Sequence, residues 1–332
     1  MSERILIVGA GAIGGVLAGY LAAAGRTVTL FARGDTARLV SERGIRLTTP
    51  DQQTLHARPQ VVTSATAAGK QDIVLFATKA FSLPAAMAAV LPAIGPDTVV
   101  APVVNGVPWW FGTVEYPVRA VDPTGSLVAA IRADRLVGAT IYSPVRRTEA
   151  GEWIHTVPGK LTLGPTHVGG SPAAADRIAS VFSGTAYTAA VSLDIRRAVW
   201  SKLVTNASFN TLCSLTGARQ IDVARDPHLG ELALRIMREI EVLARACGAG
   251  IDGDIKKYFD QAYNSGAHKP STLHDFEAGR AVELAALVDA PLELAARCGV
   301  PMPTLEMVGA AVRLKAVSAG LLPSTEFEPV AK

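Results

Sequence analysis

Residues 4–25 read RILIVGAGAIGGVLAGYLAAAG, and this stretch decides the fold. Its first five residues, Arg4–Val8, are apolar and rich in β-formers, which predicts a short buried strand. A GxGxxG turn follows at residues 9–14, and Gly14–Ala24 predicts a helix that ends at Gly25. The turn therefore lies in the strand–turn–helix context that a dinucleotide-binding turn requires.

Each glycine of the turn has a separate physical task. Gly9 permits the tight turn, Gly11 lets a pyrophosphate approach the backbone, and Gly14 lets the helix pack close to the strand. The intervening residues are Ala10, Ala12 and Ile13. Free N–H groups and the helix dipole would then attract the phosphates of the ligand. The alternative is a tight turn between a strand and a helix without a ligand.

The end of the second predicted strand, Arg26–Ala32, indicates which dinucleotide binds. Sites for NAD usually carry an acid at this position, whereas this chain has Arg33. A guanidinium can pair bidentately with a 2′-phosphate, which favours NADP(H). A solvated surface arginine is the alternative, and Asp35 lies close to it in the sequence.

The pattern along the chain predicts an α/β protein of two domains. Its 332 residues are 49% hydrophobic and 18% charged, which excludes disorder, and strands alternate with helices in the first half. This alternation predicts a doubly wound parallel sheet with right-handed crossovers. The boundary is expected near residue 190, giving domains at 1–190 and 191–332, and the polar tail from Pro323 is expected to fray.

The expected elements have the following bounds. Strands are predicted at Asp72–Ala77 and Asp97–Val104, a helix at Leu83–Ile94, and further strands between Leu136 and Leu163 that close the sheet. The second domain is predicted to be all helical, with helices at Val191–Leu215, His228–Gly248, Asp252–Ala262, Leu273–Cys298 and Thr304–Ala319.

Charge and cysteine usage exclude several classes of protein. A net charge of +3 without a basic stripe argues against nucleic acid as a partner. Three separated cysteines argue against a disulfide framework and a structural zinc site, and no metal is expected. The uncharged run Ile5–Gly25 divides into a strand, a turn and a helix, so no membrane span or signal peptide is expected. The cytoplasm is the simplest compartment.

Two clusters in the second half carry candidate catalytic chemistry. Lys202, Asn206 and Asn210 recur every four residues and would form one polar stripe on a helix. A lysine ammonium can polarise a carbonyl and donate a proton to the alkoxide that forms on reduction. Ser271 reads as a helix start whose hydroxyl could face a carboxylate, with Asp275 in the first turn. A solvated face and a plain helix cap are the alternatives.

Taken in order, these motifs resemble the ketopantoate reductases (2-dehydropantoate 2-reductases) over almost the whole chain. The resemblance rests on Gly9–Gly14, Arg33, Thr78-Lys79-Ala80, Asn105-Gly106, Trp200-Ser201-Lys202 with Asn206 and Asn210, Ser271-Thr272-Leu273 with Asp275, and Glu283. It implies a Rossmann-type domain followed by a helical domain. It also implies an NADPH-dependent oxidoreductase that reduces 2-dehydropantoate to (R)-pantoate in pantothenate biosynthesis.

The resemblance also implies a role for each matching residue. Residues 9–14 and Arg33 would bind NADPH, together with Lys79 and Asn105, and Asn105 would lie near the nicotinamide. Lys202 would donate the proton, while Glu283 would lie near both the nicotinamide ribose and the substrate as a second catalytic residue. The substrate's hydroxyl and carboxylate would be held by Asn206, Asn210 and Ser271.

Three departures from the family pattern keep other readings open. Trp109 and Trp110 follow Asn105-Gly106, where they would either pack in the core or form a lid. Gln220 stands where the family commonly has a further Asn, and Ala285 stands where the family commonly has an Asp. A second hypothesis is therefore an NADPH-dependent reductase of another branched or larger 2-oxo acid. A third is a non-catalytic NADP-binding sensor, against which the stripe at Lys202 argues. A homodimer is left open.

Overall fold

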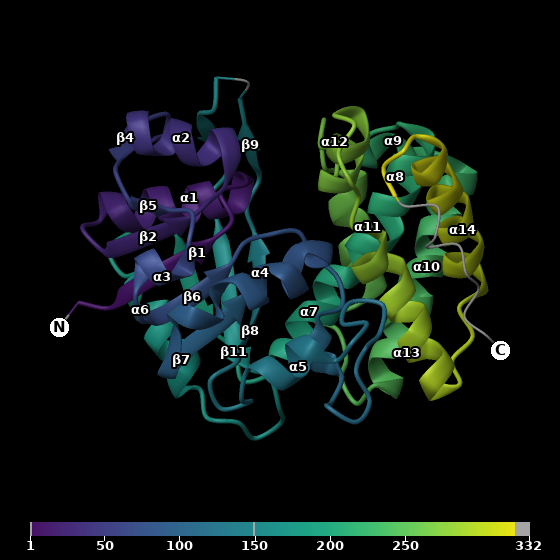
Figure 1. The fold of residues 1–332 in the computed structure, drawn as a ribbon. Coiled ribbons are helices and arrows are strands. Elements are labelled where there is room, and N and C mark those ends of the chain that lie inside the picture. The colour runs from purple at the N-terminus through teal and green to yellow at the C-terminus, as the bar shows by residue number, and fades with distance from the viewer. Residues whose placement is uncertain (1, 149, 323–332) are drawn as a thin grey trace. The chain divides into compact units, whose positions relative to one another are not determined.

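The computed structural model describes residues 2–148 and 150–322, so the tail from Pro323 lies outside the described residues. The chain forms two compact units (Figure 1). The described residues of the first unit fall within 1–105, 109–117 and 124–196, and those of the second fall within 106–108, 118–123 and 197–332. Two short segments, 106–108 and 118–123, belong to the second unit, although the chain before and after each of them belongs to the first.

The first unit is built on a five-stranded parallel sheet of the Rossmann type. Its strand order is β5-β2-β1-β6-β7, with β1 in the middle. Ile7 of β1 is paired with Leu30 of β2 on one side and with Leu75 of β6 on the other. The strands are β1 Arg4–Val8, β2 Thr27–Phe31, β5 Gln60–Val62, β6 Gln71–Phe76 and β7 Ile94–Pro102. Strand order reverses beside β1, so ligands are expected at the carboxyl ends of the strands there.

Helix α1, Ala12–Ala23, is covered on more than one side. It contacts β1 and β2 of the central sheet and also all four strands of a second sheet, of order β4-β3-β10-β9. That sheet comprises β3 Ile45–Thr48, β4 Thr54–Ala57, β9 Val145–Arg147 and β10 Trp153–His155. Residues 14–21 of α1 are all buried, which explains why the helix is apolar all round.

A third sheet, of order β12-β11-β8, completes the strands of the first unit. It comprises β8 Val137–Tyr142, β11 Lys160–Pro165 and β12 Thr188–Val191. The prediction that strands between Leu136 and Leu163 close the central sheet was wrong. Only an isolated parallel bridge, Val100 to Leu136, joins this region to β7 in the described residues. Pairing partners are decided by contacts far apart in the sequence, which local patterns do not encode.

The remaining helices of the first unit cover these sheets. The α-helices are α2 Gly34–Arg43, α3 Ala65–Ala68, α4 Leu83–Val90, α5 Ser126–Ala130 and α6 Ala173–Val181, and the short 3₁₀ turns are η1 Ala80–Ser82, η2 Leu91–Ala93 and η3 Trp109–Phe111. Helix α6 packs on β11 and β12.

The second unit is helical. Its elements are α7 Ile195–Thr205, whose first two residues belong to the first unit, η4 Asn206–Asn210, α8 Thr211–Thr216, α9 Gln220–Arg225, α10 Pro227–Ala246, α11 Ile255–Tyr263, α12 Ser271–Glu277, η5 Ala285–Asp289, α13 Ala290–Cys298 and α14 Pro303–Ser318. Helix α10 presents a continuous buried face that includes Ile236, Ile240 and Leu243.

Two of the predicted helices are interrupted. The predicted helix Val191–Leu215 begins only at Ile195, because Val191 ends β12, and it contains the π-helical segment η4. The predicted helix Leu273–Cys298 is divided between α12 and α13. Gly279, which has a φ of +63°, follows the first of these pieces, and the second is preceded by the π-helical segment η5. A fixed 3.6-residue period does not reveal such breaks.

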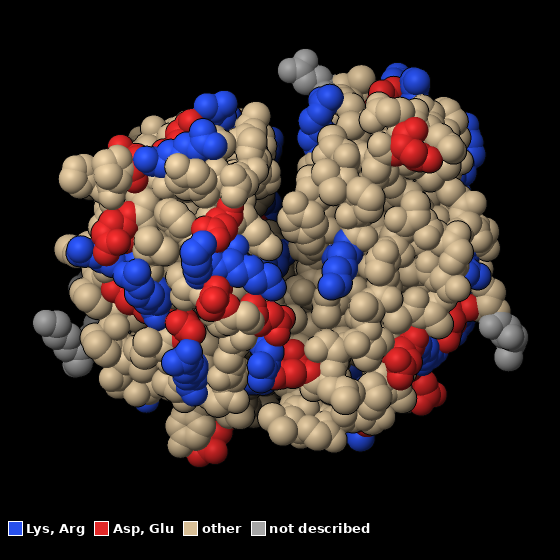
Figure 2. All heavy atoms as spheres, turned by 180° about the vertical axis from the view of Figure 1, so that it is seen from behind, with Lys and Arg blue, Asp and Glu red and all other residues tan. Residues whose placement is uncertain are grey.

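The described surface carries charges of both signs, and the described helices are not both long and apolar enough to span a membrane. On the face in Figure 2, basic and acidic side chains of the described residues are intermingled, in keeping with a net charge of only +3. Within residues 2–148 and 150–322, no helix has the length and apolar character needed to span a membrane. The run at Ile5–Gly25 is β1, the glycine turn and α1.

Candidate functional site

The glycine turn has the geometry that a bound pyrophosphate needs. Gly9 has a φ of +100°, and its N–H donates to the Phe31 carbonyl at 3.0 Å. A Cβ on Gly14 would lie 1.8 Å from the Gly9 carbonyl oxygen, so no larger residue fits there. A Cβ on Gly11 would meet no atom within 4 Å, so the space over Gly11 is open to a ligand.

The start of α1 leaves its N–H groups available to an anion. The helix begins at Ala12 with Gly11 as its N-cap, and no side chain caps it. The first N–H groups of a helix have no intrahelical acceptor, and the helix dipole favours negative charge at this end. The turn therefore fits the pyrophosphate of a dinucleotide.

Trp153 supports this turn from the second sheet, which the sequence analysis missed. Its Nε1 donates to the Gly11 carbonyl at 3.0 Å, and its side chain is fully buried. A Cβ on Gly15 would lie 2.0 Å from the indole Nε1, so Gly15 makes room for the ring. A second glycine in the middle of α1, Gly19, faces Ile45 and Leu47 of β3. Interior glycines that weaken a helix were the available signal for this close packing.

Arg33 lies at the end of β2, exposed, as the N-cap of α2. Its guanidinium carbon is 5.5 Å from the centre of the Phe31 ring. Asp35 pairs instead with Arg38, at 3.2 Å between Oδ1 and Nη2. Among the residues that the structure describes, no carboxylate forms an ion pair with Arg33, so this cation is available to an anionic ligand.

Lys79 and Asn105 follow neighbouring strands of the central sheet. Lys79 lies three residues after the end of β6, and Asn105 lies three residues after the end of β7; both are half-buried. The strands are parallel, so both residues lie at the same edge of the sheet as the glycine turn. The first unit thus gathers all the residues expected to bind the dinucleotide except Glu283.

In the second unit, Lys202 on α7 has the electrostatics of an acid catalyst. Burial lowers the pKa of its ammonium to about 8, although the charge of Glu283 acts to raise it. Glu283 is itself buried, between the buried residues Val282 and Leu284. A lysine whose pKa lies near neutrality can donate a proton at physiological pH far more readily than an ordinary one.

The two asparagines bound the π-helical segment η4 rather than continuing an α-helical stripe. Asn206 opens the segment and is half-buried, whereas Asn210 closes it and is buried. Asn210 Nδ2 donates to Thr272 Oγ1 at 3.2 Å, which joins η4 to α12. Thr272 was not among the predicted functional residues, although it stands beside Ser271 in the sequence.

Ser271 opens α12, and Glu283 lies between the end of α12 and the start of η5. Ser271 is exposed at the first position of α12, with Pro270 as the N-cap. Asp275, in the same helix, is buried and pairs with Arg280 at 3.0 Å. Glu283 lies two residues before η5, and η5 contacts η4. The second unit therefore brings together the elements that carry Lys202, Asn206, Asn210, Ser271 and Glu283.

The segment after Asn105 is anchored on η5. The Val107 N–H donates to the Ala286 carbonyl at 2.8 Å, and a Cβ on Gly106 would lie 2.4 Å from that carbonyl oxygen. Trp109 and Trp110, in the first unit, are buried. Trp110 packs edge-on to Phe111, with 4.8 Å between ring centres, and against Gly138. The two tryptophans are packing residues rather than an exposed lid.

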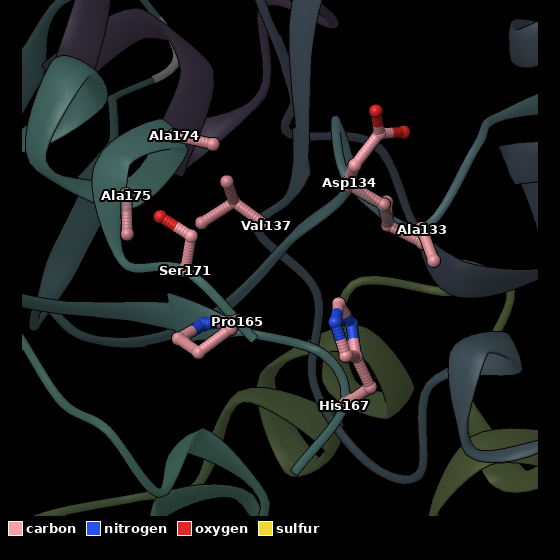
Figure 3. A pocket seen from close by; sticks show the side chains of 9 residues that line it. Ala133, Asp134, Val137, Pro165, His167, Ser171, Ala174 and Ala175 are labelled. Atoms are coloured by element: carbon pink, nitrogen blue, oxygen red, sulfur yellow. The ribbon is translucent and has the colours of Figure 1, made fainter. Parts of the chain in front are cut away.

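A small cavity of about 90 Å³ lies elsewhere in the first unit (Figure 3). Asp134, Val137, Pro165, His167 and Ser171 are among the residues that line it. None of the candidate residues lines it, and its volume is well below the 300 Å³ or more that is typical of ligand pockets.

Comparison with known proteins gives consistent matches over nearly the whole chain. The family model "Ketopantoate reductase PanE/ApbA" matches residues 5–167, and "Ketopantoate reductase PanE/ApbA C terminal" matches residues 194–316. The 2-dehydropantoate 2-reductase of Mesorhizobium japonicum is 34% identical over 324 residues, which are 96% of this chain and 99% of that protein.

Solved structures agree in fold. A candidate ketopantoate reductase from Ralstonia solanacearum MolK2 aligns with a TM-score of 0.89 at 34% identity, covering 97% of this chain and 100% of that chain. D-mandelate dehydrogenase in complex with NADH and anilino(oxo)acetate aligns with a TM-score of 0.83, covering 96% of this chain and 99% of that one. At 19% identity, the latter likeness concerns the fold alone.

Proposed function

Since the chain belongs to the ketopantoate reductase family, we propose that it reduces 2-dehydropantoate to (R)-pantoate with NADPH, a step of pantothenate biosynthesis. Family membership indicates an oxidoreductase that uses a nicotinamide dinucleotide. The observation that carries the finer proposal is the partly buried Lys202, whose pKa is about 8, with Glu283 close enough to influence it.

The residues of the first unit hold the cofactor. The N–H groups at the start of α1 bind the pyrophosphate, and Arg33 pairs with the 2′-phosphate. Lys79 and Asn105 complete the cofactor site at the carboxyl ends of β6 and β7. When bound, the nicotinamide supplies a hydride to the ketone carbon of the substrate.

The residues of the second unit handle the substrate and the proton. The Lys202 ammonium polarises the ketone oxygen and donates a proton to it as negative charge develops there. With a pKa of about 8, most of this side chain is protonated at pH 7, so the acid is present in the required form. Asn206, Asn210 and Ser271 hold the hydroxyl and carboxylate of the substrate, and Glu283 helps to keep Lys202 charged.

Oxidation of NADPH, followed by its absorbance with and without 2-dehydropantoate, tests the substrate. We expect fast oxidation with this acid and slower oxidation with a panel of branched and aromatic 2-oxo acids. An equal or better rate with another acid would show that 2-dehydropantoate is not the preferred substrate. Lys202→Ala should bind NADPH normally but lose turnover by orders of magnitude. Binding without turnover in the wild-type protein would instead favour the sensor hypothesis.

Cofactor preference has its own test. Arg33→Ala should raise the Kd for NADPH much more than the Kd for NADH. An equal increase in the Kd for NADPH and in the Kd for NADH would show that Arg33 does not bind the 2′-phosphate. Placement in the cytoplasm and assembly as a homodimer stay predictions.

A further inference from the structure

A second arginine approaches the region of Arg33 from another sheet. Arg147 is the last residue of β9, in the sheet that covers α1. Its Nη1 donates to Thr36 Oγ1 at 2.9 Å. Thr36 lies in the first turn of α2, three residues beyond Arg33, where the chain leaves the carboxyl end of β2. Arg147 is therefore held at the place where a Rossmann-type domain meets the 2′ substituent of the adenosine ribose.

Among the described residues, the surroundings of Arg147 hold no acid that pairs with its charge. Its guanidinium carbon lies 5.1 Å from the centre of the Trp153 ring, and its Nε is buried without a hydrogen-bond acceptor. Among residues 2–148 and 150–322, no carboxylate forms an ion pair with it. Other arginines of the same unit, such as Arg46, Arg132 and Arg177, each pair with an acid. A partly buried arginine with an unused donor is unusual unless a ligand completes its partners.

The position of Arg147 is coupled to the phosphate-binding turn. It stacks on Trp153, and Trp153 donates a hydrogen bond to the Gly11 carbonyl. One side chain thus contacts both the support of the glycine turn and the start of α2. A stacked guanidinium presents several donors in a fixed plane, which suits a phosphate.

We propose that Arg147 supplies a second guanidinium to the 2′-phosphate of NADP. It comes from a different sheet than Arg33, which follows β2 of the central sheet. This inference rests on the proposed use of NADPH. Arg33 contributes an exposed cation at the end of β2, and Arg147 contributes a preorganised one whose stem is fixed by Trp153. Arg147 is thus a residue that determines the preference for NADP over NAD.

The test uses binding alone, so it does not depend on turnover. Titration calorimetry with adenosine 2′,5′-bisphosphate and with 5′-AMP compares two ligands that differ by the 2′-phosphate. Arg147→Met keeps an unbranched stem over Trp153 but removes the charge. We expect about a tenfold or greater loss of affinity for the bisphosphate, as for a charge-assisted hydrogen bond, and less than a twofold change for 5′-AMP.

Controls separate this role from a structural one. Arg46→Met removes an arginine from β3 of the same sheet that already pairs with Glu152, and it should change neither affinity by more than about twofold. Equal weakening of both ligands by Arg147→Met would mean that Arg147 only supports the fold. No change in either affinity would refute its contact with the phosphate.

Arg33→Ala distinguishes failure of this inference from failure of the proposed cofactor. If Arg33→Ala selectively weakens the bisphosphate and Arg147→Met does not, only the assignment of Arg147 is overturned. If wild-type protein binds the two adenosine ligands equally and neither variant changes the ratio, the proposed preference for NADPH falls as well.

An independent observation concerns two cysteines of the second unit. Cys247 follows the end of α10 and is half-buried, and Cys298 is the exposed last residue of α13. Their Sγ atoms are 3.8 Å apart, although 51 residues separate them in sequence. The third cysteine, Cys213, is fully buried, and burial raises the pKa of its thiol to about 12, so it is unreactive.

We infer that Cys247 and Cys298 form a reversible disulfide with a low-molecular-weight disulfide as oxidant. The exposed Cys298 thiolate attacks one sulfur of the oxidant, and the oxidant's S–S bond breaks to release one thiol. The Cys247 thiolate then attacks the Cys298 sulfur and displaces the second thiol. The two protein thiols are oxidised, the oxidant is reduced to two thiols, and the two protons pass to those thiols.

Oxidised glutathione is the probe for this second site. After treatment, alkylation of the denatured protein should find one free thiol instead of three, and peptide mapping should find Cys247 joined to Cys298. Dithiothreitol should restore all three. Cys213→Ser should form the same disulfide, whereas Cys247→Ser should retain a glutathione adduct on Cys298. Three persistent thiols in wild-type protein, or an adduct on Cys298 that never resolves, would refute the inference.

Discussion

The pH dependence of turnover gives a direct test of Lys202 as the proton donor. Burial lowers the pKa of Lys202 from 10.5 to about 8. At that value the protonated fraction falls from about 90% at pH 7 to about 10% at pH 9. An ordinary lysine would still be about 97% protonated at pH 9. If the protonated form is the active one, kcat/KM should fall about tenfold between pH 7 and pH 9.

The assay is the rate of NADPH oxidation at saturating NADPH and limiting 2-oxo acid, measured from pH 6 to pH 10. Glu283→Gln adds a second observable, because the charge of Glu283 raises the pKa of Lys202. Removing that charge should move the inflection to lower pH. Glu277→Gln is the matched control, since Glu277 is a carboxylate of the same unit that pairs with Lys269 at the surface. An activity that stays constant up to pH 9, or an inflection unmoved by Glu283→Gln, would refute the role of Lys202.

Three further predictions concern stability, measured as the free energy of unfolding in urea. Lys202→Met should abolish a rise in stability between pH 8 and pH 10.5, where unfolded chains bind a proton that folded chains do not. A rise that persists in the variant over this pH range would assign it to other groups. Gly15→Ala should lower the free energy of unfolding by about 1–3 kcal/mol, because the new Cβ would lie 2.0 Å from the buried Trp153 ring. An unchanged free energy of unfolding would show that the ring can move. Burial lowers the pKa of His155, which is hydrogen-bonded to Tyr20, so the free energy of unfolding should fall as the pH drops below about 6.5. His155→Gln should flatten that fall. If the variant keeps the same dependence on pH, the fall belongs to other groups.

The elements that local patterns specify well are those around the glycine turn. The strand Arg4–Val8 was predicted with the observed bounds, and the helix after it begins at Ala12 instead of Gly14. Short apolar runs between glycines and a strict GxGxxG spacing are local properties, so they can be read without knowing the partners. The parallel sheet and the helical second half are both confirmed. They too were predicted from local patterns, the sheet from alternating strands and helices and the second half from helical periodicity.

Features that depend on distant partners could not be predicted in this way. Trp153 and Gly15 lie 138 residues apart, and only the folded chain brings the indole onto the helix. Strands β8 and β11 were predicted to extend the central sheet, yet β11 pairs with β8 on one side and with β12 on the other, in a sheet of their own. Strand propensity indicates that a segment is extended but not which edge it joins.

The π-helical segments show why the candidate site was the hardest part to predict. A stripe at every fourth residue assumes an uninterrupted α-helix, but η4 begins at Asn206 and ends at Asn210. The second such segment, η5, begins two residues after Glu283 and contacts η4. A π turn costs free energy relative to an α turn and is found frequently at functional sites. Two of them packed together, each beside a residue predicted for substrate or proton transfer, are therefore best explained by the positions they give to Asn210 and Glu283 rather than by the stability of the helices.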